Sequence, residues 1–173
     1  MPAIYKTAVR NSDVAGRGLF ALEDIPAGAH WWVADEGVKG VPCEGFTNLP
    51  IIVANKDNIK DVICQTPRNE LEDLLMYSMY YHDGDVLMIL RDGCGVVNHS
   101  NKPNSKLVLN PEGDWKKLKS VALRDIKAGE EILENYSLYS KKNVEWIEEV
   151  YRQYLPERIE FETVANIQKE EST

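Results

Sequence analysis

The sequence predicts a single α+β domain made mainly of short strands. The chain has 173 residues, which suits one compact domain, and its 43% hydrophobic fraction can form a core. Strand-like apolar runs bounded by turn residues recur along most of the chain, whereas two segments follow helical spacing. We therefore expect a domain over residues 1–140 with a helical insert at about 45–85. A C-terminal helix and polar tail, residues 141–173, should pack on the same domain.

An internal repeat and a hairpin pattern support the strands. Residues 21–28 read Ala-Leu-Glu-Asp-Ile-Pro-Ala-Gly, and residues 122–129 read Ala-Leu-Arg-Asp-Ile-Lys-Ala-Gly. Each copy predicts two strands joined by a tight turn, because glycine permits the positive φ that such turns need. Residues 105–110 and 115–123 flank Pro-Glu-Gly-Asp, which predicts a hairpin. The apolar run at 86–90 predicts a buried strand.

Helical spacing marks the insert and the C-terminal segment. Thr66 and Pro67 suit the N-cap and first position of a helix that continues to about His82. Its apolar face comprises Leu71, Leu74, Leu75 and Met79. A second helix is expected from about Lys141 to Leu155. Its apolar face comprises Val144, Ile147, Val150, Tyr151 and Tyr154.

The bulk composition argues against several classes of function. A net charge of −8 disfavours nucleic acid as a partner and suits a Lys-rich peptide, although it also simply favours solubility. Residues 1–6 lack a signal-like pattern, and no apolar run is long enough to span a membrane. The three widely spaced cysteines predict neither a disulfide framework nor a zinc site. We expect an intracellular protein without a metal, in the nucleus or the cytoplasm.

Three short blocks carry the functional signal. Residues 16–20 read Gly-Arg-Gly-Leu-Phe, residues 98–104 read Asn-His-Ser-Asn-Lys-Pro-Asn, and residues 129–136 read Gly-Glu-Glu-Ile-Leu-Glu-Asn-Tyr. In this order they resemble the SET-domain protein lysine methyltransferases, over roughly residues 10–140. The resemblance implies a SET fold, which is a β-clip with a knot-like threading of the C-terminal segment. It also implies S-adenosylmethionine as the cofactor.

The resemblance assigns a cofactor site to named residues. It implies that the backbone of Arg17 and Gly18 holds the cofactor while Gly16 shapes the turn. It implies further that Asn98 contacts the methionine part and that the backbone of His99 contacts adenine. Glycine lets a backbone approach a ligand closely, and an amide side chain both donates and accepts hydrogen bonds.

Tyr136 is the predicted catalytic residue and is also expected to contact the cofactor. The substrate lysine, with a solution pKa of about 10.4, must lose its proton before it attacks the methyl group of a sulfonium. Desolvation and the sulfonium charge both lower that pKa, so no strong base is needed in the pocket. A phenol oxygen would help to align the reacting atoms and accept weak C–H···O contacts.

Tyr80, Tyr81 and Glu134 are further candidates for the wall of a lysine channel. Tyrosine suits an apolar lysine stem and a methylammonium head, although core packing is the commoner role at helical spacing. Strand alternation would place Glu134 on the same side as Tyr136, at a position where the family usually carries Phe or Tyr. An ionised carboxylate there would oppose deprotonation of the lysine.

Two other departures from the family bear on function. Gly95-Val96 stands where the family often has Arg-Phe, and no cysteine follows Cys94 to build the zinc module that closes the site in many relatives. We expect Trp146 on the C-terminal helix to cover the adenine instead, its plain alternative being a place in the core.

The sequence thus predicts an S-adenosylmethionine-dependent protein-lysine N-methyltransferase, with a Lys-containing protein or peptide such as a histone tail as substrate. A non-catalytic SET-like domain that binds peptides is the alternative, because of Glu134 and the missing Arg-Phe. A sugar-binding β-clip domain would leave the Asn-His-Ser run without a purpose. Neither nucleic acid nor a membrane is an expected partner.

Overall fold

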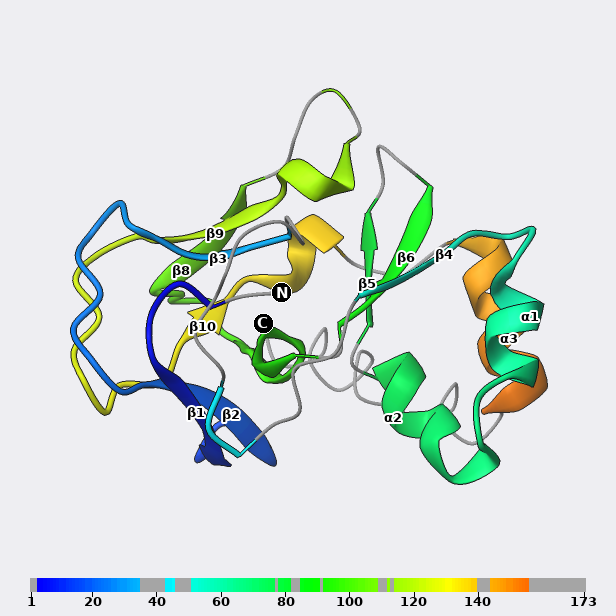
Figure 1. Ribbon diagram of the computed structural model, residues 1–173, viewed down its shortest axis with the longest axis horizontal. Coiled ribbons are helices and arrows are strands. Elements are labelled where there is room, and N and C mark those ends of the chain that lie inside the picture. The colour runs from blue at the N-terminus through cyan, green and yellow to red at the C-terminus, as the bar shows by residue number, and fades with distance from the viewer. Residues whose placement is uncertain are drawn as a thin grey trace, which may run out of the picture. The chain divides into compact units, whose positions relative to one another are not determined.

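A computed structural model (Figure 1) describes most of the chain. The chain divides into two compact units, residues 1–140 and residues 141–173. Within its described part, the first unit holds four small sheets. The expectation that the C-terminal unit packs on the first stays a prediction. The described residues are 3–34, 43–45, 51–76, 78–81, 85–90, 92–108, 112, 114–139 and 144–155.

The first sheet is a hairpin of β1 (Thr7–Asn11) and β2 (Arg17–Ala21), paired antiparallel. Its turn closes where the Ser12 amide donates to the Gly16 carbonyl at 2.9 Å. Gly16 has a φ of +47°, a left-handed conformation that favours glycine. Alternation along β2 buries Leu19 and Ala21, so one face of the hairpin joins the core.

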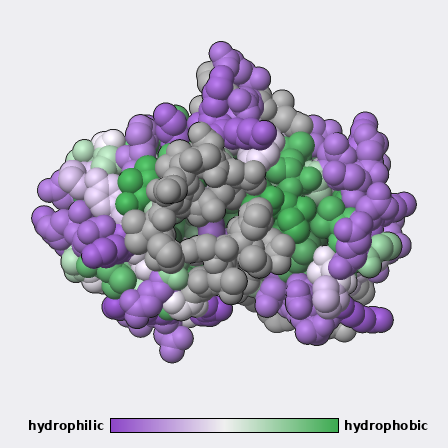
Figure 2. All heavy atoms as spheres, viewed as in Figure 1, coloured by the Kyte–Doolittle hydropathy of each residue, from purple (hydrophilic) through white to green (hydrophobic). Residues whose placement is uncertain are grey.

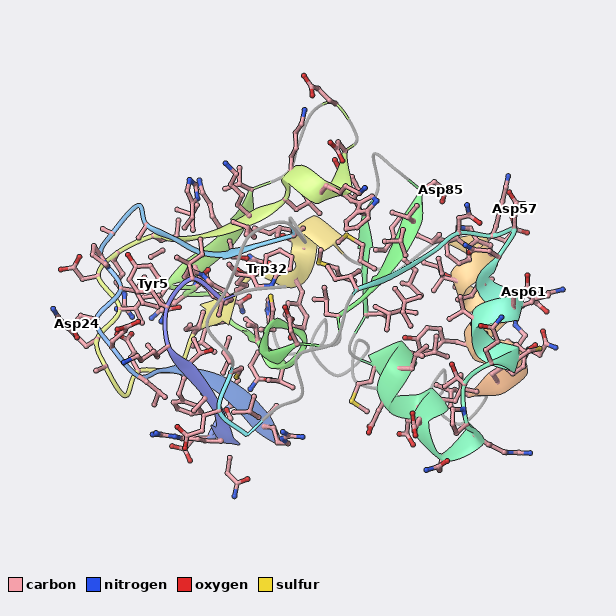
Figure 3. The ribbon with its side chains drawn as sticks, viewed as in Figure 1. Tyr5, Asp24, Trp32, Asp57, Asp61 and Asp85 are labelled. Carbon is pink, nitrogen blue, oxygen red and sulfur yellow. The ribbon has the colours of Figure 1, made fainter. Side chains whose placement is uncertain are left out.

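The second sheet has the order β3 (His30–Val33), β9 (Lys119–Ala122) and β8 (Ser105–Val108), all antiparallel. Pairing of β8 with β9 confirms the predicted hairpin. The connection is longer than predicted, because Trp115–Lys117 forms a 3-10 helix instead of extending the strand. Trp31 and Trp32 of β3 are buried in the core, and Figure 3 shows Trp32 well inside this unit.

The two copies of the internal repeat pair with each other. Ile25 and Ile126 each donate a backbone N–H to the other's carbonyl at 2.9 Å. The Gly28 amide donates to the Ala122 carbonyl at 2.8 Å, and the Gly129 amide donates to the Ala21 carbonyl at 2.7 Å. Figure 1 shows the two loops side by side at the left, and Figure 3 places Asp24 at their outer edge.

The third sheet has the order β4 (Ile52–Ala54), β6 (Val86–Ile89) and β5 (Ser78–Tyr81). The buried strand predicted at 86–90 is therefore confirmed as its central strand. The insert also contains α1 (Ile59–Cys64), the 3-10 helix η1 (Arg68–Glu70) and α2 (Leu71–Met76).

The helix predicted from Thr66 to about His82 is wrong in both its start and its length. The Thr66 hydroxyl donates back to the Val62 carbonyl at 2.8 Å, and Pro67 is the N-cap of η1. The helix ends at Met76, and Met79 lies in β5 opposite Met88 of β6. Pairing with β6 therefore overrides the helical spacing of the apolar residues.

The fourth sheet joins two short parallel strands, β7 (Asn98–His99) and β10 (Leu133–Glu134). The 3-10 helix η3 (Gly93–Val96) precedes β7, and the 3-10 helix η5 (Tyr136–Tyr139) follows β10. This pairing brings the second and third functional blocks together. The knot-like threading of the C-terminal segment stays a prediction.

The C-terminal unit contains α3 (Glu145–Tyr154), and Val144 occupies its N-cap position without a side-chain hydrogen bond. Ile147 and Val150 are buried, as expected for its apolar face. Residues 141–143, Pro156 and the tail lie outside the described residues. Across the described chain, no helix combines the length and hydropathy that crossing a bilayer would require. Figure 2 shows hydrophilic residues over most of the coloured surface in this view.

Candidate functional site

Asn98 joins the glycine block to the start of β7. Its side-chain Nδ2 donates to the carbonyl oxygens of Ala15 at 3.1 Å and Arg17 at 3.0 Å. The same nitrogen lies 2.8 Å from Oε1 of Glu131. One amide group therefore contacts the loop before β2 and the Gly-Glu-Glu block, so the three sequence blocks meet at Asn98.

Glu131 fills the space beside Gly18. Its two carboxylate oxygens lie 2.8 and 2.9 Å from the Ser12 hydroxyl, which donates to them. A Cβ added to Gly18 would lie 2.1 Å from Oε1 of Glu131. The carboxylate thus occupies the space beside Gly18, and a side chain at position 18 would displace it. The predicted contact of Arg17 and Gly18 with the cofactor stays a prediction, whereas the left-handed φ of Gly16 fits its predicted role in the turn.

The side chain of Tyr136 contacts the backbone of Val97, the residue before Asn98. Its phenol O–H donates to the carbonyl of Val97. Although 40% of the Tyr136 surface is exposed, its hydroxyl lies inward. Burial raises the pKa of the phenol to about 12, and the negative charge of Glu134 adds to this effect. At neutral pH the phenol therefore stays protonated and acts as a donor, not as a base.

His99 holds the backbone of Tyr136. The Tyr136 amide donates to Nδ1 of His99 at 3.1 Å, and the rings lie 5.3 Å apart between centroids. Nδ1 can accept only when it lacks a proton, so this contact assigns the ring proton to Nε2, which lies 3.2 Å from Oδ1 of Asn101. The His99 side chain thus positions Tyr136, while the predicted backbone contact with adenine stays a prediction.

Glu134 is almost fully buried, with 4% of its surface exposed. The Ser105 hydroxyl donates to its Oε1 at 2.9 Å and accepts from Nε1 of Trp31 at 2.7 Å. The strand ends at Glu134, and Tyr136 begins a 3-10 helix, so strand alternation does not extend to Tyr136. The premise for a shared direction is therefore wrong, and a place for Glu134 in the channel wall stays a prediction.

Tyr80 and Tyr81 lie in strand β5 and not on a helix. Both are buried, and the Tyr80 hydroxyl donates to Oδ1 of Asp85 at 2.7 Å. Burial, together with Asp85, raises the pKa of Tyr80 to about 12. Asp85 lies at the start of β6 in Figure 3. Strand β5 contacts η5, the 3-10 helix that Tyr136 begins, and the role of the two tyrosines in a channel stays a prediction.

Asn104 is a structural residue of the site that the sequence analysis missed. It is 1% exposed, and its Nδ2 donates to the Glu131 carbonyl at 2.7 Å. Its Oδ1 accepts from the Leu133 amide at 2.8 Å. Asn104 thus fastens the end of the second block to β10. Its place as the last residue of that block was the available signal.

The two adjacent glutamates of the third block have different surroundings. Glu130 forms an ion pair with Arg124 on the surface. The Arg124 guanidinium lowers the pKa of the Glu130 carboxyl to about 2, and the Lys127 amide contributes to this effect. Glu131, in contrast, is held by the neutral groups of Ser12 and Asn98.

Trp146 belongs to α3 in the C-terminal unit and is partly buried, and its cover of adenine stays a prediction. Among the residues that the structure describes, no three His, Cys, Asp or Glu side chains are grouped so that they could hold a metal ion.

Comparison with known proteins identifies the same blocks. The model of the SET domain matches residues 16–137. No curated protein sequence matches the chain significantly.

Among solved structures, the chain resembles ctPRC2 in an autoinhibited conformation bound to S-adenosylmethionine, with 23% identity and a TM-score of 0.53 over 87% of this chain. It also resembles a humanised mutant of the Chaetomium thermophilum Polycomb Repressive Complex 2 bound to the inhibitor GSK126, with 21% identity and a TM-score of 0.51 over 81% of this chain. The chain spans only 17% and 16% of those two proteins. At these identities the likeness concerns the fold, and the predicted SET fold is confirmed.

Proposed function

The chain belongs to the SET-domain family, and from this premise we propose that it is an S-adenosylmethionine-dependent protein-lysine N-methyltransferase. The observation that carries the proposal is the convergence at residues 97–99. The Val97 carbonyl accepts from the Tyr136 phenol, Asn98 binds the glycine loop, and His99 accepts from the Tyr136 amide. The glycine loop, proposed for the cofactor, and Tyr136, proposed for catalysis, thus both contact one three-residue stretch.

The groups around Asn98 fit the cationic end of this cofactor. The carbonyls of Ala15 and Arg17 and the carboxylate of Glu131 are all hydrogen-bond acceptors. An ammonium group offers only donors, and a carboxylate favours a nearby positive charge. When bound, the cofactor supplies an electrophilic methyl group on a sulfonium. That ctPRC2 was determined bound to S-adenosylmethionine also supports this choice. We assign the cofactor site to Gly16, Arg17, Gly18, Asn98, His99 and Tyr136.

Tyr136 would act as a neutral phenol. Its raised pKa, about 12, leaves it protonated at neutral pH, so it does not remove the lysine proton. Desolvation in the pocket lowers the lysine pKa, and the proton leaves to solvent. The phenol oxygen can donate to Val97 and also accept weak contacts from a polarised methyl group. The hydrogen bond from the Tyr136 amide to His99 positions Tyr136, so that its phenol can align the lysine nitrogen for in-line attack on the methyl group.

The proposed substrate is a lysine side chain of an intracellular protein, with a histone tail as the first candidate. The net charge of −8 supports a Lys-rich partner. Tyr80, Tyr81 and Glu134 are proposed for the channel wall. Trp146 on α3 is proposed to cover the adenine in place of a zinc module.

A second candidate function is peptide binding without catalysis. Two observations favour it: Gly95-Val96 replaces the family's Arg-Phe, and the Glu134 carboxylate is committed to Ser105 in the core. Such a protein would bind the cofactor or the peptide without transferring a methyl group.

Label transfer tests the two functions. The purified chain is incubated with methyl-tritiated S-adenosylmethionine and either core histones or a whole-cell lysate, and labelled residues are identified by mass spectrometry. We expect label on lysine. Cofactor binding without any protein labelling would favour the peptide-binding function and contradict the proposed transferase.

A further inference from the structure

Glu131 lies beside the glycine block, and its backbone is held by β2. Its backbone pairs with Phe20 of β2, and the next amide, that of Ile132, donates to the Leu19 carbonyl at 2.7 Å. The carboxylate then reaches the Ser12 hydroxyl and the Asn98 amide. The backbone on both sides of Gly18 is paired with β1, and the carboxylate lies at the position that a Cβ on Gly18 would take.

The contacts of Asn98 determine which way its amide group faces. All three partners of Nδ2 are acceptors: two backbone carbonyls and the Glu131 carboxylate. A flipped amide would place Oδ1 against these acceptors and lose every one of the contacts. The arrangement therefore directs Nδ2 toward the loop and leaves Oδ1 directed away from it, as an acceptor for a ligand.

The charge of Glu131 has no cationic partner within ion-pair distance among the described residues. Its carboxylate accepts hydrogen bonds from Ser12 and Asn98, which are both neutral. Arg17, the cation of the glycine block, donates from Nη2 to the Gly45 carbonyl at 3.3 Å. A ligand cation near Asn98 would therefore meet a negative charge that no described side chain neutralises.

We propose that Glu131 is a positioning and specificity residue, which orients the Asn98 amide and makes the site prefer ligands with a cationic amino-acid end. This inference rests on the proposed function and adds a residue to it. Glu130, one position earlier, provides the matched control, since its carboxylate pairs with Arg124 on the surface.

Calorimetry with two probes tests the proposal. S-adenosylhomocysteine carries the amino-acid end, and 5′-methylthioadenosine lacks it. The wild-type chain should prefer the first probe. Glu131→Gln, which is isosteric but carries no charge, should weaken the binding of S-adenosylhomocysteine by about 10-fold or more. It should leave methylthioadenosine unchanged. Glu130→Gln should change neither affinity.

Several results would overturn the proposal. One is a Glu131→Gln variant that keeps the wild-type preference. Another is a variant that loses affinity for both probes equally together with thermal stability, as substitution of a purely structural residue would cause. Glu131→Asp keeps the charge and should retain part of the preference, so a folded Asp variant without any preference also contradicts the proposal. If the wild-type chain binds neither probe, the proposed function itself fails. Binding by the wild type with an unchanged Glu131→Gln variant would sink this inference alone.

Discussion

The two copies of the internal repeat fold alike but lead into different surroundings. In both, a glycine with positive φ donates to an alanine carbonyl of the other copy, and an aspartate accepts from an alanine amide of the other copy. Beyond the turns the copies differ. The first continues into Trp31 and Trp32, which are buried in the core. The second continues into Glu131, Glu134 and Tyr136, which carry hydrogen bonds of the candidate site.

This difference separates the requirements of the fold from those of the site. The repeated residues supply the paired turns, and they do so equally in both copies. The candidate chemistry depends on the polar residues that follow the second turn. Equivalent substitutions in the two copies should therefore lower stability by equal amounts. Substitutions after the repeat should affect activity only where they follow the second copy.

The largest effect is expected from Tyr136→Phe. Removal of one preorganised polar group should slow methyl transfer by about 10²-fold or more, while the cofactor stays bound. Initial rates with labelled cofactor and a calorimetric affinity check these two statements. Tyr5→Phe, at a tyrosine packed against the core, serves as the control and should keep its rate. Full activity of Tyr136→Phe would refute the catalytic assignment.

A smaller effect is expected at Ser105, which links the segments that follow the two copies. Its hydroxyl accepts from Trp31, which follows the first copy, and donates to Glu134, which follows the second. Ser105→Ala leaves both buried groups without this partner, so the free energy of unfolding should fall by about 1–3 kcal/mol. Denaturant titration measures the change.

Ser120 on the adjacent strand provides a matched control for Ser105→Ala. Its buried hydroxyl has no hydrogen-bond partner among the described residues. Ser120→Ala should therefore leave the stability unchanged or raise it, because a buried unpaired hydroxyl is removed. Equal losses in the two variants would contradict the importance of the Trp31–Ser105–Glu134 chain.

Substitution of the two turn glycines should have equal effects. Gly28 has a φ of +78° and Gly129 a φ of +89°, and neither position has an atom within 4 Å of an added Cβ. Gly28→Ala and Gly129→Ala should each lower the free energy of unfolding by about 1–2 kcal/mol through backbone strain alone. A clear inequality in denaturant titration would show that the copies are not structurally equivalent.

The smallest effect is a dependence of stability on pH, which arises from the ion pair of Arg124, in the second copy, with Glu130, which follows it. Because the folded pKa of Glu130 is about 2, below its ordinary value of 4.5, the Arg124 contact contributes stability that is present above pH 4.5. That contribution is lost as the pH falls through about 2. The stability difference between wild type and Glu130→Gln should shrink over this range in denaturant titrations. A difference that stays constant with pH would contradict the ion pair.

Local pattern was sufficient for some elements and insufficient for others. The repeat predicted both glycine turns, because left-handed φ is a local property of glycine. It could not predict that the copies pair with each other, since 101 residues separate Ala21 from Ala122, and register between distant strands is not local. The insert shows the opposite failure: apolar spacing around Met79 fits a helix, but pairing of β5 with β6 determines a strand.

The candidate site was predictable to the extent that its residues lie in recognisable blocks. Asn98 and Tyr136 were singled out by their blocks, and the structure brings them together through Val97. Glu131 was not singled out, because its importance arises from its contact with the position beside Gly18 and with Ser12, both of which are distant in sequence. Glu134 was given a direction from strand alternation, which fails where β10 ends.

The central claim is that Asn98 lies in a site for S-adenosylmethionine, and calorimetry of that cofactor tests it most directly. The wild-type chain should bind with measurable heat. Asn98→Ala should weaken binding by about 10- to 100-fold, as expected for the loss of a buried polar contact worth about 1–3 kcal/mol. Asn58→Ala, at the N-cap of α1 in the insert, should bind as the wild type does. No detectable heat with the wild-type chain, or equal affinity for wild type and Asn98→Ala, would contradict the account.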